Sequence, residues 1–383
     1  MSSRAPAILV LEDGRVFRGE AFGSVGETFG EAVFSTGMTG YQETLTDPSY
    51  YGQVVAQTAP QIGNTGWNDE DDESRRIWVA GYVVRDASRV SSNWRAKRGL
   101  EDELASQGVV GICEVDTRAL TRHLRDKGAM RVGISSRTTD AEELLAKVRN
   151  TPQMAGANHV GAVTASEPYT YEAKGVQKYT VAAIDLGIKR NTPRRLAERG
   201  ITTTVFPAYA DVDAVLADAP DAVFLSNGPG DPATADHQVE LTRELLRRRV
   251  PVFGICFGNQ ILGRALGLET YKLKFGHRGI NQPVLDRHTN KIEITAHNHG
   301  FALKAPEVSE GQSGEFFETE FGRVQVSHVC LNDDVVEGLT CLDAPAYSVQ
   351  YHPEAAGGPH DADYLFDRLV ELIESTKGAK ADA

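Results

Sequence analysis

The pattern of hydrophobic and polar positions divides the chain into two parts. From residue 179 onward, short apolar runs suited to buried strands alternate with segments of helical periodicity. Strands are predicted at 179–185, 202–206, 222–226 and 250–255, with helices at 190–198, 212–218, 235–249 and from 259 on. Repeated strand–helix units predict a mostly parallel sheet with helices on both faces. In such a sheet the ligand site lies at the carboxyl ends of the strands.

The first part of the chain lacks this regular alternation. Asp13-Gly14 joins two apolar segments and predicts a β-hairpin. Residues 34–64 hold many glycines and small hydroxyl side chains, which favour loops joining short strands, and the acidic segment 68–76 is predicted to be exposed. Further strands are predicted at 77–84, 109–114 and 130–134, and helices at 100–106, 116–127 and, after a capping box of Thr139 and Glu142, to about 149. This part is predicted to be mixed α and β.

Chain length and residues 151–178 indicate the domain organisation. A chain of 383 residues exceeds one typical core. The segment 151–178 is rich in proline and glycine and has little periodicity, as expected at a domain boundary. The prediction is an α/β protein with an N-terminal domain over 1–150, a linker over 151–178 and a C-terminal domain over 179–383.

Composition narrows the class of protein. The net charge of −13 argues against nucleic acid or an acidic membrane surface as the main partner. We expect a cytoplasmic protein, since the sequence has no apolar run of membrane length and no signal peptide. The cysteines are scattered and form no CxxC pair, so they indicate neither a zinc site nor a disulfide framework. They are Cys113, Cys256, Cys330 and Cys341.

One cysteine has neighbours that suggest chemistry. Cys256 follows a predicted strand and precedes a predicted helix, with Gly254 and Gly258 two places on either side. This is the layout of a nucleophile elbow, whose tight turn leaves no room for a Cβ at the glycines. The adjacent helix N-terminus favours a thiolate. A buried structural cysteine remains an equally good reading of this stretch alone.

Two polar turns lie at other predicted strand ends. The turn 226–232, SNGPGDP, could present backbone N–H groups to an oxyanion or amide, although a plain tight turn is the simpler interpretation. In the stretch 297–301, HNHGF, two histidines at i and i+2 of a strand face the same side. No carboxylate or cysteine stands at a ligand-like spacing, so we expect contacts to a polar ligand and no metal.

A third strand ends in His352-Pro353-Glu354. Because residues i and i+2 of a strand point the same way, Glu354 can accept a hydrogen bond from the His352 ring. Pro353 restricts the backbone of both residues and holds the pair in place. A histidine oriented by a carboxylate is what a cysteine nucleophile needs.

Together these stretches resemble a known family. GICFGNQ around Cys256, SNGPGDP, HNHGF and QYHPE occur in the order found in the class I (triad) glutamine amidotransferases, a resemblance that covers the chain from about residue 179. FSTGMTGYQETLTDPSY, APQIGNTG, CEVDTRALTRHLRDKG and KFGHRGINQPV are similar to the small, glutamine-hydrolysing subunits of carbamoyl phosphate synthetases. That second resemblance extends over essentially the whole chain.

The resemblance implies specific roles. Cys256 would be the nucleophile, His352 the acid/base and Glu354 its orienting partner. The backbone N–H of Phe257 and, by our choice, that of Gly228 would hold the oxyanion. L-Glutamine would be bound by Ser49, Gly228, Gly230, Phe257, Gln260, Asn298, Gly300 and Phe301. The sequence departs from many members at Asn259, where they have histidine, which concerns packing beside the site and leaves the mechanism intact.

The resemblance also implies a partner. Ammonia released from glutamine would pass through a tunnel to a large synthetase subunit that makes carbamoyl phosphate for arginine and pyrimidine biosynthesis. This chain has no Walker A loop, so we expect no cofactor on it, and ATP and Mg on the large partner. Two alternatives remain: an amidotransferase serving another synthase, against which the N-terminal domain argues, and a catalytically silent subunit, against which the complete Cys256, His352 and Glu354 set argues.

Overall fold

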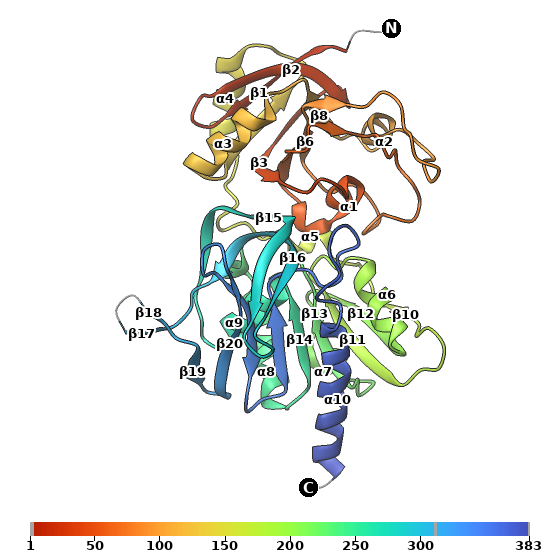
Figure 1. Ribbon diagram of the computed structural model, residues 1–383, viewed down its shortest axis with the longest axis vertical. Helices are drawn as coiled ribbons and strands as arrows, with labels where there is room; N and C mark the ends of the chain where they lie inside the picture. The colour runs from red at the N-terminus through yellow and green to blue at the C-terminus, as the bar shows by residue number, and fades with distance from the viewer. Residues whose placement is uncertain (1–3, 310–311, 382–383) are drawn as a thin grey trace. The chain divides into compact units, whose positions relative to one another are not determined.

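The computed structural model describes residues 4–309 and 312–381. The chain forms two compact units (Figure 1). Unit 1 comprises residues 1–157 and 274–279, and unit 2 comprises 158–273 and 280–383. The predicted boundaries of the N-terminal domain, linker and C-terminal domain stay a prediction. In the described residues no helix is long and apolar enough to cross a membrane.

Unit 1 is built on a closed barrel of mixed parallel and antiparallel strands. Its strands, in the order in which they pair, are β1 (Pro6–Leu11), β2 (Val16–Gly23), β8 (Val110–Cys113), β6 (Gly81–Val83), β4 (Gln53–Gln57), β3 (Glu27–Ser35) and β9 (Met130–Ser135). β1 closes the barrel because it pairs antiparallel with both β2 and β9. The predicted hairpin around Asp13-Gly14 is the β1–β2 connection.

Helices cover this barrel. They are α2 (Leu100–Ser106), α3 (Thr117–Lys127) and α4 (Ala141–Arg149), near the predicted positions. Alternate residues of β1 explain its apolar sequence: Leu9 packs in the barrel core, whereas Ile8 and Val10 pack with Leu144 of α4. Both faces of β1 are therefore buried, and its hydrophobic run is continuous.

Three local predictions in unit 1 were wrong. The segment expected to hold only loops and short strands contains α1 (Tyr41–Thr46) and the 3₁₀ turn η1 (Pro48–Tyr50), besides β5 (Gln61–Ile62), which pairs with β7 (Asp86–Ala87). The segment 68–76 is partly buried: Asn68, Glu73 and Ser74 are each at most 9% exposed, and Ser74 Oγ donates to Thr46 O. The cap of α4 is Asp140, not Thr139, because its carboxylate accepts from the first N–H groups of the helix.

Unit 2 contains, within the described residues, an 11-stranded sheet (Figure 1). The central strands β12 (Ile201–Pro207), β11 (Tyr179–Asp185), β13 (Ala222–Leu225), β14 (Val252–Ile255) and β22 (Ala346–Val349) are parallel. Antiparallel strands extend both edges: β10 (Tyr169–Tyr171), β21 (Val336–Cys341), β20 (Gly322–Cys330), β19 (Phe316–Thr319), β15 (Thr270–Asp286) and β16 (Lys291–Leu303). The pair β17 (Glu307–Ser309) and β18 (Gln312–Ser313) is separate.

Helices flank both faces of this sheet, as the α/β prediction requires. Along β13, Val223 and Leu225 face one cluster, which includes residues of α8 (Asp236–Arg247) and α9 (Phe257–Ala265). Phe224 faces the opposite cluster, with residues of α6 (Asn191–Glu198) and α10 (Leu365–Ala381). The remaining short elements are α5 (Val160–Val163), α7 (Val212–Val215) and η2 (Pro232–Thr234). The adjacent strands β13, β14 and β22 end at one edge, which brings three of the predicted turns together.

Candidate active site

Cys256 occupies the turn between β14 and α9, as predicted for a nucleophile elbow. Its backbone has φ 56° and ψ −102°, a conformation that L-residues rarely adopt. A Cβ on Gly254 would lie 2.6 Å from Gly258 O, and one on Gly258 would lie 2.2 Å from Leu225 O. The two glycines are therefore required because the turn presses against its own helix and against β13.

The Cys256 side chain is buried and directed toward β16. Its Sγ donates to Asn298 O at 3.7 Å, and its backbone N–H donates to Val349 O at 2.8 Å. Phe257 is the first residue of α9, so its N–H group lacks an intrahelical acceptor. A substrate oxygen beside Cys256 could accept a hydrogen bond from it.

His352 and Glu354 form the predicted hydrogen bond. His352 Nδ1 lies 2.7 Å from Glu354 Oε1, and His352 N donates to Ala296 O at 2.9 Å. Glu354 Oε1 also lies 2.9 Å from Lys189 Nζ. All three side chains are buried. Lys189 comes from the loop between β11 and α6, so the strands β11 and β22 of one sheet supply both partners of this ion pair.

The mutual electrostatic interactions of Lys189, His352 and Glu354 determine which of these side chains are charged. Burial and the positive charge of Lys189 lower the pKa of His352, but Glu354 and the sulfur of Cys256 outweigh them and raise it to about 10. Burial raises the pKa of Glu354, but Lys189 and His352 outweigh burial and bring it to about 2. At neutral pH the pair is therefore an imidazolium beside a carboxylate.

Hydrogen bonds fix the side chains of α9 that face β16 and β22. Gln260 Nε2 donates to Phe301 O at 2.8 Å and to Gln350 Oε1 at 3.0 Å. Asn259 Nδ2 donates to Gln350 Oε1 at 3.1 Å, and Ser348 Oγ donates to Asn259 Oδ1 at 2.9 Å. Asn259 therefore joins α9 to β22, as expected for a packing residue, while Asn298, Gly300 and Phe301 lie together on β16.

The turn after β13 lies against the loop after β11. A Cβ on Gly228 would lie 2.2 Å from Leu186 O, and Gly230 has φ 98°. Asn227 Nδ2 donates to Gly187 O at 2.8 Å. Glycine is therefore required at both positions, and this turn is more constrained than a plain surface turn.

Comparison with known proteins identifies the family. Residues 9–134 match the family described as carbamoyl-phosphate synthase small chain, CPSase domain, and residues 182–372 match glutamine amidotransferase class-I. A carbamoyl phosphate synthase small chain of Streptomyces coelicolor is 66% identical over 376 residues, which cover 98% of this chain and 97% of its own. The chain belongs to the carbamoyl phosphate synthase small chain family.

Another member of this family, from Mycobacterium tuberculosis (strain H37Rv), is 60% identical over 96% of this chain and 98% of its own length. Among solved structures, a putative GMP synthase component from Thermoplasma acidophilum matches 53% of this chain and 98% of its own. Its TM-score is 0.44 and its identity 19%, which is too weak a likeness to support an argument. The predicted resemblance and α/β class are thus confirmed.

Ser49 is the one predicted glutamine contact outside unit 2. It lies in η1 of unit 1, where it is buried and its N–H donates to Asp47 Oδ1 at 2.9 Å. Asp47 caps the N-terminus of this 3₁₀ turn and Pro48 is its first residue, so the backbone of Ser49 is held in place.

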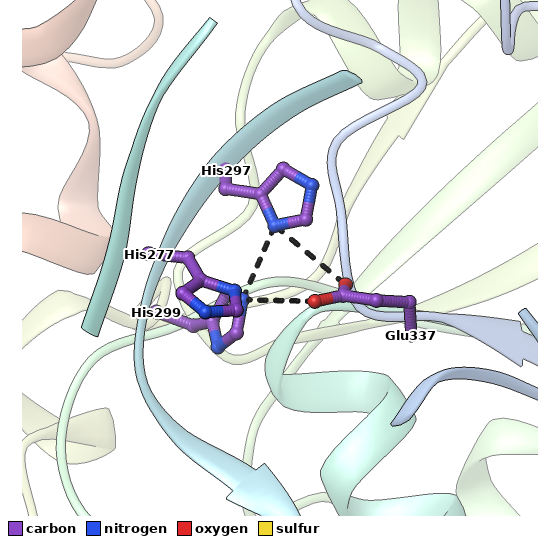
Figure 2. A group of neighbouring side chains, drawn as sticks. All are labelled: His277, His297, His299 and Glu337. Atoms are coloured by element: carbon purple, nitrogen blue, oxygen red, sulfur yellow. Dashed lines mark hydrogen bonds and ion pairs between the residues drawn. The ribbon is translucent and has the colours of Figure 1, made fainter. Parts of the chain in front are cut away.

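Sequence reasoning missed two buried charged residues. Lys189 lies in no recognisable motif, and the only indication of a role is its place just after a predicted strand. No carboxylate stands at a ligand-like spacing in the sequence around 297–301, but the fold brings one close. Glu337 Oε2 lies 3.6 Å from His297 Nδ1, and Glu337 Oε1 lies 3.7 Å from His299 Nε2 (Figure 2). Glu337 is on β21, far along the chain, so spacing could not reveal it.

Proposed function

We propose that this member of the carbamoyl phosphate synthase small chain family hydrolyses L-glutamine with Cys256, His352 and Glu354 as its catalytic triad. The observation that carries the proposal is a geometric one. The elbow cysteine follows β14 and donates its N–H to Val349 O of the neighbouring strand β22, and β22 is followed by His352 and Glu354, which are joined by a 2.7 Å hydrogen bond. The sulfur of Cys256 is among the groups that raise the pKa of the His352 imidazole, so the two side chains interact.

The thiolate attacks the side-chain amide carbon of glutamine. The developing oxyanion accepts hydrogen bonds from the N–H groups of Phe257 and Gly228. His352 then donates its proton to the amide nitrogen, the C–N bond breaks, ammonia leaves and a γ-glutamyl thioester remains. Having given this proton to the leaving nitrogen, His352 is a neutral imidazole. The neutral imidazole can then accept a proton from the water that releases glutamate.

Glutamine is bound at the ends of the strands of unit 2. Asn298, Gly300 and Phe301 on β16 and Gln260 on α9 are connected by the hydrogen bond from Gln260 to Phe301. They provide backbone and amide groups suited to the polar ends of an amino acid. Gly228, Gly230 and Phe257 complete the set in unit 2. The family resemblance also implies Ser49 as a glutamine contact.

The released ammonia is a substrate of a large synthetase subunit. The family name distinguishes a small chain, and its relatives are named carbamoyl phosphate synthase small chain. The large subunit binds ATP and Mg and converts bicarbonate and channelled ammonia into carbamoyl phosphate for arginine and pyrimidine biosynthesis. Channelling keeps ammonia from becoming ammonium in bulk water. This chain thus acts as the glutaminase of a cytoplasmic heterodimer.

Reconstitution of Cys256→Ser with the large subunit tests this function. Glutamine-dependent carbamoyl phosphate synthesis should be abolished, whereas synthesis from added ammonium salt should survive. Cys341→Ser is a matched control, because burial raises the pKa of Cys341 to about 12 and keeps it a thiol at neutral pH. Retained glutamine-dependent synthesis in Cys256→Ser would contradict the role of Cys256. Loss of ammonia-dependent synthesis in an assembled mutant complex would contradict the division of labour.

A further inference from the structure

Two histidines and a glutamate of unit 2 meet in the protein interior (Figure 2). His297 and His299 lie on β16 and Glu337 lies on β21. The side chains of His297 and Glu337 are 0% exposed and that of His299 is 2% exposed. His297 Nδ1 lies 3.2 Å from His299 Nε2, and both rings approach the Glu337 carboxylate. The triad of the proposed function uses none of these groups.

The outer nitrogen of each ring is engaged by a fixed oxygen. Thr295 Oγ1 donates to Gln282 O at 2.8 Å, so its single hydrogen is used and it accepts from His297 Nε2 at 2.7 Å. Phe301 O can only accept, so His299 Nδ1 donates to it at 2.9 Å. Each outer nitrogen therefore carries a hydrogen, and in the neutral rings the lone pairs lie on His297 Nδ1 and His299 Nε2.

Those two lone pairs face each other and the carboxylate. Three electron-rich groups this close need positive charge among them, supplied either by a proton on one ring or by a metal cation. Histidines that bind metals through one nitrogen donate the other N–H to an oxygen, as both rings do here. We propose that His297, His299 and Glu337 bind one divalent transition-metal ion of the zinc type. His277, also drawn in Figure 2, belongs to unit 1 and is no part of the proposed ligand set.

The donor chemistry and spacing favour this class of ion. Imidazole nitrogen with one carboxylate suits zinc and its neighbours among the first-row metals, whereas calcium and magnesium prefer oxygen ligands. Ligands about 2.0–2.1 Å from a tetrahedral zinc lie about 3.3 Å from each other. The separations of 3.2, 3.6 and 3.7 Å bracket this value, so small side-chain shifts would complete the site.

The bound ion would join two strands that are not neighbours. In the sheet, β20 and β15 separate β21 from β16. A metal held by both β21 and β16 would fix the segment of β16 that also carries Asn298 and Phe301. The site itself is inferred from the ligands alone and stands whether or not those residues bind glutamine.

Metal analysis of the full chain tests the proposal. The chain is produced in defined medium with zinc as the added transition metal, in a Cys256→Ser background that removes the sulfur ligand near His352. Elemental analysis should find about one zinc per folded chain. Glu337→Gln should lower this content at least about 10-fold. Glu293→Gln removes a different buried glutamate of unit 2 and should leave the zinc content unchanged.

Spectroscopy and diffraction make each outcome decisive. Growth with cobalt in place of zinc should give visible cobalt bands without thiolate-to-metal charge transfer, because the proposed ligands contain no sulfur. Anomalous diffraction at the zinc edge locates the ion even if Glu337→Gln fails to fold. A folded background protein without stoichiometric metal, zinc retained by folded Glu337→Gln, a thiolate band, or an anomalous peak elsewhere only would each overturn the proposal. The first of these results would mean that a shared proton holds the three groups together.

Discussion

Lys189 and His352 approach the same oxygen atom of a buried carboxylate. Lys189 Nζ lies 2.9 Å from Glu354 Oε1, and His352 Nδ1 lies 2.7 Å from it. Glu354 is fully buried, so its negative charge depends on both partners. Lys189 stabilises the carboxylate and also lowers the pKa of the His352 imidazole. Its positive charge therefore makes it easier for His352 to release a proton.

Replacing Lys189 with methionine should destabilise the protein. The change leaves the Glu354 carboxylate buried without its cation, so we expect the free energy of unfolding to fall by about 3–5 kcal/mol in urea titrations. Lys189→Arg keeps the charge and should cost much less. Adding Glu354→Gln to Lys189→Met should recover part of the loss, since the buried charge is gone. A double mutant whose loss equals the sum of the single losses would argue against a coupled pair.

Replacing Glu354 with glutamine should shift the pH dependence of glutamine hydrolysis. Glu354 raises the pKa of His352, so its neutralisation lowers that pKa from about 10. The imidazolium is then lost at lower pH, and the alkaline limb of the kcat profile should move down in pH. The fall in kcat near neutral pH should be much smaller than that in His352→Asn. Equal and complete loss in both variants at every pH would contradict an orienting role for Glu354.

Replacing Gly258 with alanine should disrupt the elbow. The added Cβ would lie 2.2 Å from Leu225 O, a backbone atom of β13 that cannot rotate away. We expect a loss of about 1–3 kcal/mol of stability together with a large fall in glutaminase turnover. Gly378→Ala on α10 is the control, because no atom lies within 4 Å of its Cβ. Normal turnover in Gly258→Ala would mean that α9 can move away from β13 without harm.

Replacing Ser49 with alanine tests the contribution of unit 1 to glutamine binding. Loss of one hydrogen bond to the substrate should cost about 0.5–1.5 kcal/mol and appear mainly as a raised KM for glutamine. Ser74→Ala, which removes another buried hydroxyl of unit 1, should leave KM unchanged. An unchanged KM in a folded Ser49→Ala protein would exclude Ser49 from the binding site.

The parts predicted from sequence are those set by local rules. The elbow needs a strand, a tight turn with glycines and a helix, all within a few residues, and it lies where predicted. The His352–Glu354 hydrogen bond follows from strand periodicity alone. Repeated strand–helix units likewise sufficed for the parallel centre of the unit 2 sheet.

The parts that were missed depend on distant segments. Closure of the unit 1 barrel requires β1 to pair with β9, and no local pattern encodes that contact. Helix α1 follows a glycine in a segment of loop-like composition, and it is stabilised because Tyr41 and Leu45 are buried one turn apart. Glu337 reaches His297 and His299 only through folding of the sheet, so the residues that flank the two histidines in the sequence do not reveal it.

The backbone of Cys256 has a consequence for protein engineering. Its φ of 56° belongs to a region in which a non-glycine residue costs about 1–3 kcal/mol. Glycine would relieve that strain but would remove the reactive sulfur, so stability and activity favour different residues at this position. Libraries selected for heat resistance alone should therefore enrich Cys256→Gly and drift toward inert chains. Any stabilisation programme for this scaffold has to couple its thermal screen to an activity screen.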